Sequence, residues 1–591
     1  VLALLVMLAV AASGSERRRR EQALLRIRGA SLVQVLRLAW IEAAVIALLG
    51  VIMGLILASI TAVAWWRLAD FRLVVPWFVL AGVIGLIFGL AAFLIPAWRD
   101  ATQTTVSAAR AELGKTTSPL WQRLYADFAF LVIGAIVFWT VATNGYEIVL
   151  APEGVAQTSV HYEAFLAPLC LWIGAGLLWI RLGRLVLGQG QGVVAAVLAP
   201  MSASLAPTIA ASLSRQQRRM ATGVALVALA FAFATATAIF NTTYNAQARV
   251  DAELTNGADV TVTGTSTHPA GAVLRQLQAI PGVAAAEPMM HRFAYVGADL
   301  QDMFGINPAH IGKVTTISNA YFANHNADKT LALLAETPDG VLVSQETVND
   351  FQLQPGDRLN LRLQSALDHQ YHVVPFRLID VVREFPTAPK DSFLVANANY
   401  IASNTGSDAA EVVLLRTSKD AEAAVLAARK LVGPQGGMKV TTLGETQAII
   451  SSSLTAVDLR GLTTLELAFS VLMIAGVTGL VLALDLTERR RSFTILSALG
   501  ARSSQLGAFL WSEGLFVVFG GAILGIVIGF GIAYVLVTLL AGVFDPPPEA
   551  LSIPWLYVAV ALGTALVCGS LAIAGVQALS KKPDLETLRG G

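Results

Sequence analysis

Two segments far apart in the chain share one pattern, and this repetition constrains the fold more than any other feature. Each has a run of arginines, a short amphipathic stretch, the dipeptide Gly-Ala and a long apolar stretch; they are Arg17–Gly54 and Glu488–Gly529. A gap-free alignment matches Gly29/Gly500, Ala30/Ala501, Gln34/Gln505, Trp40/Trp511, Glu42/Glu513, Gly50/Gly521 and Gly54/Gly525. Chance rarely matches such different residue types together, so we interpret the segments as an internal duplication of a membrane unit.

The composition indicates a membrane protein. Hydrophobic residues make up 55% of the 591 residues and charged residues only 14%, whereas soluble domains carry about 25% charged residues. The net charge of +1 creates no global field that would attract nucleic acid. Cys170 and Cys568 lie in apolar runs without a CxxC or Cys/His neighbour, so we expect buried hydrophobic residues rather than a disulfide or metal ligands.

Nine apolar runs approach the length of about 20 residues that a membrane span requires. The first ends near Ser13, and we expect its beginning to be missing, so that the chain is N-terminally incomplete. The others are about Ser31–Trp66, Val74–Ala97, Phe128–Thr143, Phe165–Leu187, Met220–Phe240, Thr463–Leu486, Leu506–Leu540 and Pro554–Ala578.

The distribution of Lys and Arg sets the orientation. If every run crosses, nearly all clusters of basic residues fall on one side, and the loops Asn144–Tyr162 and Ala541–Ser552 contain none. Among the short loops, only a turn with Arg67 and Arg72 departs from this pattern. The basic side is cytoplasmic by the positive-inside rule. We therefore expect a multi-pass protein of the cell (inner or cytoplasmic) membrane with its large polar region outside the cytoplasm.

The polar region between Asn241 and about Arg460 has the pattern of an α+β domain. Short alternating stretches predict strands, and helical patterns lie between them. The predicted strands are Ala258–Gly264, Gly340–Gln345, Asp357–Leu363 and Glu411–Thr417. The predicted helices are Ala270–Ala279, Glu346–Phe351 and Lys419–Leu431. A region of this size can bury its own core.

These patterns give a division into five parts. Residues 1–115 form the first membrane repeat, with its first helix truncated, and residues 116–200 an additional pair of transmembrane helices with linkers. Residues 201–241 form the helix that opens the second half, 242–459 the extracytoplasmic α+β domain, and 460–591 the second repeat. Gly188–Gly192, GQGQG, predicts a flexible connection.

Taken together, these features resemble the FtsX-like/MacB-like ABC transporter permeases of the ten-helix type. Each repeat is similar to an FtsX-type domain in its arginine run, amphipathic stretch, Gly-Ala and long helix with an internal Glu. Ser212–Ala236 is similar to the lead-in and first helix of such halves. In the polar region, Pro281–Pro288 and Gly340–Leu361 look like parts of the MacB-like extracytoplasmic core.

The resemblance implies a non-catalytic permease subunit whose partner, an ABC ATPase dimer, binds ATP and Mg. It also implies that Glu21–Ala30 and Ser492–Ala501 are coupling helices. The expected coupling residues are Glu21, Leu24, Leu25, Arg28, Gly29, Ala30, Ser492, Ile495, Leu496, Leu499, Gly500 and Ala501. Apolar residues at helical spacing, and glycines suited to a left-handed cap, fit this role. The alternative is a pair of interfacial helices with arginines at lipid headgroups.

The two repeats are not equivalent throughout. Arg28 of the first stands where the second has Leu499, and Arg26 where the second has Ser497. Glu42 and Glu513 are intramembrane polar residues, and a carboxylate there should face protein or water. They could link coupling and spanning helices, relay protons, or pair with a neighbour near the cytoplasmic surface.

Glycines recur along both long helices, at Gly50, Gly54, Gly521, Gly525 and Gly529. This spacing suits close helix contact, although glycine is also common in membrane helices.

The resemblance implies that ATP hydrolysis on the partner changes the conformation of the outer domain. That change would serve export of a lipid, lipoprotein, peptide or drug, or regulation of a cell-wall enzyme. The alternatives are a signalling or adaptor protein without transport and an ion-coupled transporter. The sequence lacks GxxxxGK[ST], GxSxG and HExxH motifs, and His369 and His372 have no third ligand in view, so we expect no catalytic, cofactor or metal site on this chain.

Overall fold

The computed structural model divides into two compact units, each described by itself. Unit 1 comprises Val1–Thr242, Leu459–Leu540 and Leu551–Gly591, and unit 2 comprises Thr243–Asp458 and Ala541–Ala550. The structure describes residues 24–25, 28–66, 75–102, 119–144, 148–150, 156–158, 165–202, 206–215, 217–389, 392–418, 421–433, 437–452, 467–479, 503–540, 548 and 550–580.

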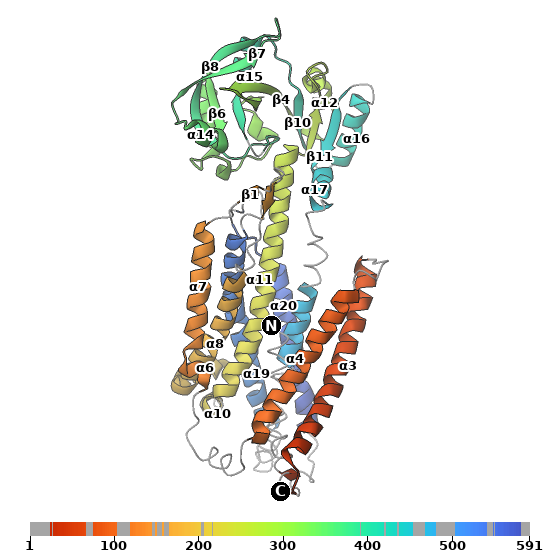
Figure 1. The fold of residues 1–591 in the computed structure, drawn as a ribbon, viewed down its shortest axis with the longest axis vertical. Coiled ribbons are helices and arrows are strands. Elements are labelled where there is room, and N and C mark those ends of the chain that lie inside the picture. The colour runs from red at the N-terminus through yellow and green to blue at the C-terminus, as the bar shows by residue number, and fades with distance from the viewer. Residues whose placement is uncertain are drawn as a thin grey trace. The chain divides into compact units, whose positions relative to one another are not determined.

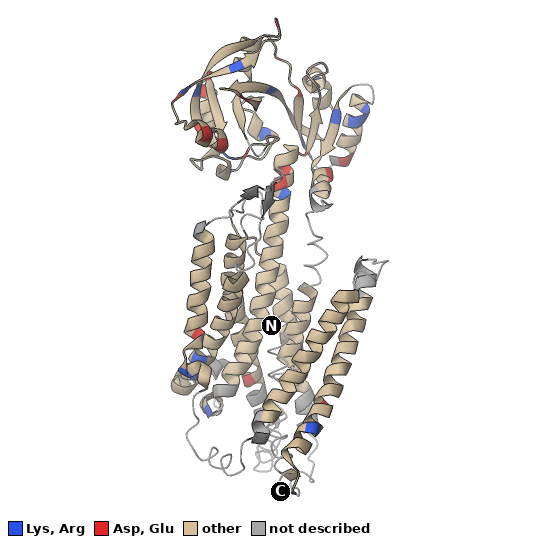
Figure 2. Cartoon of the chain, in the orientation of Figure 1, with Lys and Arg blue, Asp and Glu red and all other residues tan. Residues whose placement is uncertain are grey.

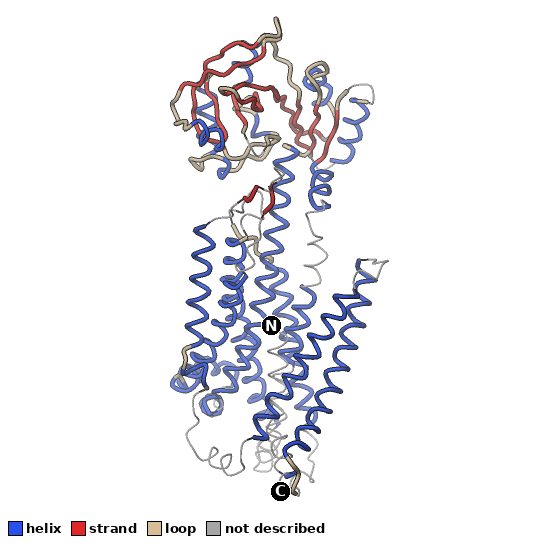
Figure 3. The backbone as a smooth tube through the Cα atoms, viewed as in Figure 1, coloured by secondary structure: helices blue, strands red, loops and turns tan. Residues whose placement is uncertain are grey.

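Unit 1 consists mainly of long apolar helices (Figures 1 and 3). They are α3 (Leu32–Trp66), α4 (Val75–Thr102), α7 (Ala126–Asn144), α8 (Leu166–Gln189), α11 (Gln217–Asn256), α19 (Ser503–Leu539) and α20 (Trp555–Ser580). Shorter helices are α6 (Leu120–Arg123), α9 (Gln191–Ser202) and α10 (Ala206–Arg215), and β1 (Ile148–Leu150) pairs with β2 (Ala156–Thr158).

Helices are present at seven of the predicted spans. Among the described residues, six helices are long and apolar enough to cross a membrane, and Ala126–Ala142 and Leu467–Gly479 are shorter apolar helices. The helix at Leu467–Gly479 covers part of another predicted span, and the partial run ending near Ser13 lies outside the described residues. Figure 2 shows that charged residues are sparse along the described parts of the unit 1 helices and lie toward their ends, as expected for helices in a bilayer.

The core of unit 1 is built around α11. Phe231 and four alanines of α11 are buried in one cluster with residues of α8, α10, α19 and α20; the alanines are Ala230, Ala232, Ala234 and Ala236. Small side chains on α11 permit close approach of the neighbouring helices, which is how membrane helices gain packing energy. By contrast, α3 and α4 pack mainly on each other, and most of their large apolar side chains are exposed.

The GQGQG segment differs from the predicted flexible connection. Helix α8 continues through Gln189, and α9 starts at Gln191, so only Gly190 lies outside a helix. The Gly190 N–H still donates to the Val186 carbonyl at 2.8 Å, and the Val194 N–H donates to the Gly190 carbonyl at 3.0 Å. Backbone hydrogen bonds therefore run across the junction and make it a helical corner.

Unit 2 contains a nine-stranded mixed sheet. Its strands are β3 (Val260–Thr263), β4 (Val283–Val296), β5 (Asp299–Ile306), β6 (Gly340–Ser344), β7 (Arg358–Gln364), β8 (Tyr371–Val382), β9 (Phe393–Asn397), β10 (Val412–Thr417) and β11 (Lys439–Thr442). The order is β11-β3-β10-β4-β5-β9-β6-β8-β7, and β7 also pairs with β4. This additional pairing closes β4, β5, β9, β6, β8 and β7 into a six-stranded barrel.

Alternating side chains explain the barrel. In β7, Leu359, Leu361 and Leu363 are buried while the residues between them are exposed. Because successive side chains of a strand point to opposite faces, these leucines form one face. They belong to a single buried cluster with apolar residues of the other barrel strands.

The first part of β4 continues into a second layer. There β4 pairs with β10, β10 with β3, and β3 with β11, all antiparallel. Apolar residues of this layer form a cluster with residues of α12 (Leu274–Gln278) and α16 (Ala421–Val432). The long strand β4 thus belongs to both the barrel and this layer.

The remaining helices of unit 2 are α13 (Ala327–Glu336), α14 (Gln345–Phe351), α15 (Ala398–Thr405) and α17 (Leu443–Ser452). Side chains of Asn326, Ser344 and Asn397 cap α13, α14 and α15 by accepting from backbone N–H groups. The predicted strands correspond to β3, β6, β7 and β10, and the predicted helices to α12, α14 and α16. The α+β class of this region is confirmed.

Candidate functional site

The first candidate coupling segment ends in a defined cap. The Arg28 N–H donates to the Leu24 carbonyl at 3.1 Å, and the Ala30 N–H donates to the Leu25 carbonyl at 3.0 Å. Gly29 lies between them with a φ of +91°. A left-handed glycine followed by this six-to-one hydrogen bond is a Schellman motif, which ends a helix and turns the chain. The left-handed cap predicted at Gly29 is therefore present.

The next helix starts directly after this cap. The Ser31 N–H donates to Gln34 Oε1 at 2.9 Å, and the Gln34 N–H donates to Ser31 Oγ at 3.3 Å. This reciprocal pair is a capping box at the start of α3. One helix thus ends and the next begins within three residues, which fixes a corner without a flexible linker.

Apolar side chains before the corner face solvent. Leu24 is 56% exposed and Leu25 is 37% exposed. Glu21 lies outside the described residues, and Arg28 is exposed. Exposed leucines on a short helical segment are compatible with both alternatives that the sequence left open, a docking helix and an interfacial helix at the lipid headgroups.

The second candidate coupling segment lies outside the described residues. This holds for all of its expected residues, Ser492, Ile495, Leu496, Leu499, Gly500 and Ala501. The alignment of the repeats places Arg502 at the position of Ser31. Arginine has no acceptor, so the second repeat lacks the serine half of the capping box.

The two matched glutamates have different surroundings. Glu513 is only 2% exposed and lies on α19 next to the buried Ser512. Glu42 is exposed on α3 and has no hydrogen bond or ion pair within the part of the chain that the structure describes. The two carboxylates are therefore equivalent in sequence but not in burial.

The glycines of α19 form a packing surface against α11. A Cβ atom at Gly521 would lie 2.5 Å from Val227 Cγ1, and one at Gly529 would lie 2.7 Å from Thr235 Cβ. At Gly525 a Cβ would collide with the Ala228 carbonyl and Phe231 Cβ. Only glycine fits at these three positions. They thus confirm, for the second repeat, close helix contact through small residues.

The glycines of α3 make no such contact. No atom of the described residues comes within 4 Å of a Cβ placed at Gly50 or Gly54. Of the two interpretations that the sequence allowed, close helix contact therefore describes α19 in this structure.

A buried ion pair between α7 and α8 was not expected from the sequence. Arg181 Nε donates to Asp127 Oδ2 at 2.5 Å, and Arg181 Nη2 donates to Asp127 Oδ1 at 2.8 Å and to the Gln122 carbonyl at 2.9 Å. Asp127 is fully buried, and the guanidinium also lies 4.6 Å from the Tyr125 ring centroid. The available signal was an arginine within the apolar run Phe165–Leu187, since such a charge needs a partner.

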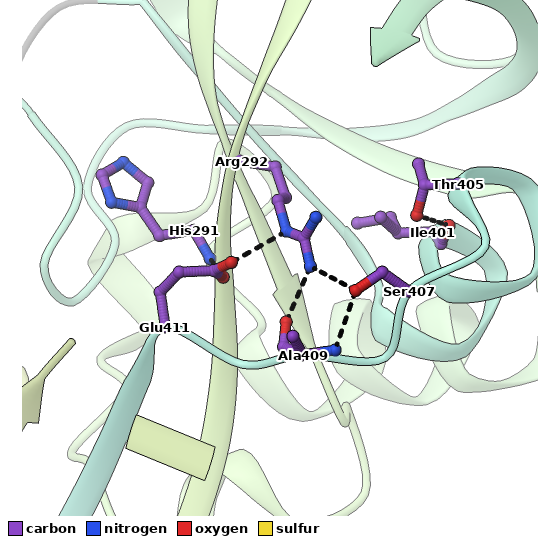
Figure 4. A network of polar contacts seen from close by, with 7 residues as sticks. All are labelled: His291, Arg292, Ile401, Thr405, Ser407, Ala409 and Glu411. Atoms are coloured by element: carbon purple, nitrogen blue, oxygen red, sulfur yellow. Dashed lines mark hydrogen bonds and ion pairs between the residues drawn. The ribbon is translucent and has the colours of Figure 1, made fainter. Parts of the chain in front are cut away.

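A second polar network in unit 2 joins β4 to the segment after α15 (Figure 4). Arg292 Nε lies 3.2 Å from Glu411 Oε1, and Arg292 Nη2 donates to the Ala409 carbonyl at 2.8 Å. The His291 N–H donates to Glu411 Oε2 at 3.1 Å. This network sits where β4 changes partners from β10 to β5, between Met289 and Met290. It holds the junction between the layer and the barrel.

A pocket of about 250 Å³ lies beside the first part of β4, with Glu287, His310 and Lys313 in its wall. His310 Nδ1 lies 3.6 Å from Glu287 Oε1. Burial raises the pKa of Glu287, and the charges of His310 and Lys313 oppose this rise. No sequence pattern marked this pocket.

The described residues contain no group of three or more His, Cys, Asp or Glu side chains that could hold a metal. His372 Nε2 lies 2.7 Å from Asp368 Oδ2, so this histidine pairs with a carboxylate and not with His369. Hydrogen bonds from the Gln370 backbone and from His372 lower the pKa of Asp368 to about 2.

The fold and the paired segments define a class: a multi-pass membrane protein with an α+β core domain outside the cytoplasm. Two family models match this chain. The model of the FtsX-like permease C-terminal region matches residues 1–99 and 465–583, and that of the MacB-like periplasmic core domain matches residues 222–431. The chain is an FtsX-like permease with a MacB-like periplasmic core domain, the non-catalytic membrane subunit of an ABC transporter.

One solved structure with similarity is the crystal structure of the extracellular domain of the noncanonic ABC-type transporter YknZ from Gram-positive bacteria. It has 12% sequence identity and a TM-score of 0.21, and the match covers 31% of this chain and 99% of that chain. No curated protein matched the chain. The family assignment depends on the two family models.

Proposed function

We propose that this permease converts ATP hydrolysis on a separate ATPase dimer into a conformational change of its extracytoplasmic domain. Glu21–Ala30 and Ser492–Ala501 dock on the two ATPase subunits, which bind the ATP and Mg. In this proposal one permease chain supplies both docking segments, because the repeat provides two.

The observation that carries the proposal is the corner at Gly29. The Schellman motif and the capping box fix the angle between the docking segment and α3, and Leu24 and Leu25 are exposed before the corner. A rigid corner transmits a displacement of the docking segment to the spanning helix, whereas a flexible linker would absorb it.

In the second half, this motion would pass through α19 and α11. Ser492–Ala501 leads directly into α19, and α19 packs on α11 through its three glycines. Helix α11 is a single helix of 40 residues. Near its end, the Leu254 carbonyl accepts from the Thr387 N–H at 2.8 Å, and Leu254 belongs to a buried cluster of unit 2. Movement of the second docking segment would reach α11 through its packing with α19, and the C-terminal end of α11 belongs to the core domain.

The resulting movement of the core domain would perform one of three functions. It would extract or export a lipid or lipoprotein, expel a peptide or drug, or regulate a cell-wall enzyme. All three require the same coupling from the cytoplasmic ATPase to the outer domain, so the coupling is the part to test first.

The test is ATPase activity of the full-length permease co-purified with its ATPase, in wild type, Leu24→Asp and Leu496→Asp. We expect each substitution to release the ATPase or to reduce permease-dependent hydrolysis by about tenfold, because burying one unpaired carboxylate in a contact costs about 1–3 kcal/mol. The matched control is Leu120→Asp on α6, where the leucine is 75% exposed and outside both docking segments.

The proposal fails if no ATPase co-purifies, or if both substitutions behave like Leu120→Asp. An ion-coupled transporter would bind no ATPase, and substitutions at Glu42 and Glu513 would then be the informative ones. A complex with two permease chains per ATPase dimer would overturn only the assignment of both docking segments to one chain.

A further inference from the structure

The α3–α4 hairpin has a cavity of about 440 Å³ near the start of α3 and the end of α4. Its wall is made of five apolar or aromatic side chains together with one arginine. The six residues are Val33, Leu36, Arg37, Trp40, Leu94 and Trp98. A second cavity of about 370 Å³ lies further along the same helix pair, with Leu48 and Leu86 in its wall and no charged residue among its lining residues.

Rows of residues on the two helices lead from one cavity to the other. On α3, Leu36, Trp40 and Leu48 belong to one row with a spacing of four residues. On α4, a row of the same spacing contains Leu86 and Leu94. Because residues four apart on a helix share one face, the two rows run side by side from the first cavity to the second.

One residue of each row lies between the cavities. They are Ala44 on α3 and Leu90 on α4, and both are half-buried. Ala44 has a short side chain that projects little from α3 at this point, whereas the longer apolar side chain of Leu90 projects further from α4. An apolar row along α3, with Leu90 on one side, therefore leads from one cavity toward the other, and it is called the strip below.

The residue types at the cytoplasmic end of this strip, tryptophan and arginine, are those that concentrate at the headgroup level of a membrane. Because the core domain that follows α11 is extracytoplasmic, successive crossing by α3, α4, α7, α8 and α11 places the start of α3 on the cytoplasmic side. Trp40 is 54% exposed and Trp98 is 60% exposed, and tryptophans concentrate at the headgroup level of bilayers. Arg37 is exposed in the wall of the same cavity and has no hydrogen bond or ion pair among the described residues.

The length of the strip fits one leaflet. Half of a hydrocarbon core of about 30 Å corresponds to about ten residues of helix at 1.5 Å each. Starting from Arg37, this distance reaches about Leu48, so an acyl chain would pass over Ala44 and end at the second cavity.

We propose that the α3–α4 hairpin binds one anionic phospholipid of the cytoplasmic leaflet, with its phosphate on Arg37 and an acyl chain over Ala44. The guanidinium supplies the positive charge that a phosphate group requires, and the two indoles lie at the headgroup level. The site belongs to the first repeat alone. In the gap-free alignment, Arg37 corresponds to Ala508 and Leu36 to Gly507.

The experiment measures binding of the first lipid to the purified full chain by native mass spectrometry. The probes are palmitoyl-oleoyl phosphatidylglycerol and palmitoyl-oleoyl phosphatidylcholine, which differ in headgroup charge and share their acyl chains. We expect wild type to prefer the phosphatidylglycerol by roughly fivefold, the ratio given by about 1 kcal/mol for one basic residue near a membrane surface. Arg37→Gln should abolish this preference, and Arg37→Lys should keep it.

The matched control for the headgroup is Arg123→Gln, which removes one exposed arginine from α6 and has the same effect on net charge. It should leave the preference unchanged. The headgroup site is overturned if wild type shows no preference, if Arg37→Gln retains it, or if Arg123→Gln loses it equally.

A second pair of variants tests the acyl path. Ala44→Phe places a large side chain on the strip between the cavities, so it should weaken binding of both lipids. Val45→Phe adds bulk at the next position of α3, which is exposed and belongs to a different row, and it should leave binding unchanged. Equal binding by Ala44→Phe and wild type, or equal losses in the two variants, would overturn the acyl path.

Discussion

The two repeats share their glycines, their tryptophan and their glutamate, yet the structure surrounds them differently. In the second repeat, α19 packs on α11 and its Glu513 is buried. In the first repeat, α3 packs mainly on α4, and Glu42, Gly50 and Gly54 are exposed. The difference teaches that a duplicated sequence does not impose a duplicated environment.

The reason is the presence of α11 on one side. We call the row of glycines at four-residue spacing on each long helix a glycine ladder. It contributes packing energy only when another helix packs against it, since an apolar surface gains little by leaving lipid. In the second half, the valines, alanines and Phe231 of α11 fill the ladder. The same residue types on α3 therefore have a different energetic role in this structure.

The largest expected effect comes from filling the ladder that α11 occupies. Gly525→Leu forces a side chain into the Ala228 carbonyl and Phe231, so it should destabilise the chain by about 3 kcal/mol or more. Gly54→Leu on α3 is the matched control, and it should change stability by less than about 0.5 kcal/mol. The measurement is the thermal unfolding midpoint of each purified variant in the same detergent. Equal midpoints would show that the two ladders are equivalent after all.

The next effect comes from the matched glutamates. Glu513→Leu should lower the free energy of unfolding by about 1–3 kcal/mol. The substitution removes a buried carboxylate, and the polar groups that interact with it would lose that interaction. Glu42→Leu should be close to neutral, since Glu42 is exposed. Chemical-denaturation curves of the two variants and wild type would measure the difference. A larger loss for Glu42→Leu would reverse the assignment of the buried and exposed carboxylates.

The smallest effect concerns the helix starts. Ser31→Ala removes the serine half of the capping box and should cost about 1 kcal/mol. The reciprocal change, Arg502→Ser, places a serine three residues before Gln505 and should stabilise the second repeat by a similar or smaller amount. Thermal midpoints with Ser504→Ala as the control for α19 would test this. Destabilisation by Arg502→Ser would mean that the two helices start differently.

Sequence patterns predicted the long apolar helices well because length and hydrophobicity decide them. Ser31–Trp66 was expected and α3 covers Leu32–Trp66. The end of α11 was not predicted. Its hydropathy falls after Phe240, but the helix continues to Asn256 because Leu254 enters the core of unit 2. Local composition carries no information about such a tertiary contact.

The site was predictable where it depends on local geometry. Gly29 and Ala30 suggested a left-handed cap, and the hydrogen bonds show it. The pairing of Arg181 with Asp127, and the role of β4 in two layers, depend on which segments meet in space. These contacts join residues more than 50 positions apart, so periodicity within a window cannot reveal them.

Closure of the barrel has a consequence for how the core domain folds. Strands β4 and β7 meet only at Ala294–Leu363 and Tyr295–Arg362. The chain must close a loop of about 70 residues before these pairs form, and such non-local pairings slow folding into the millisecond-to-second range. Until then both strands have unpaired edges, which are templates for association with other chains. Closing the barrel therefore protects the newly translocated domain from aggregation, and the time to closure sets how long it needs that protection.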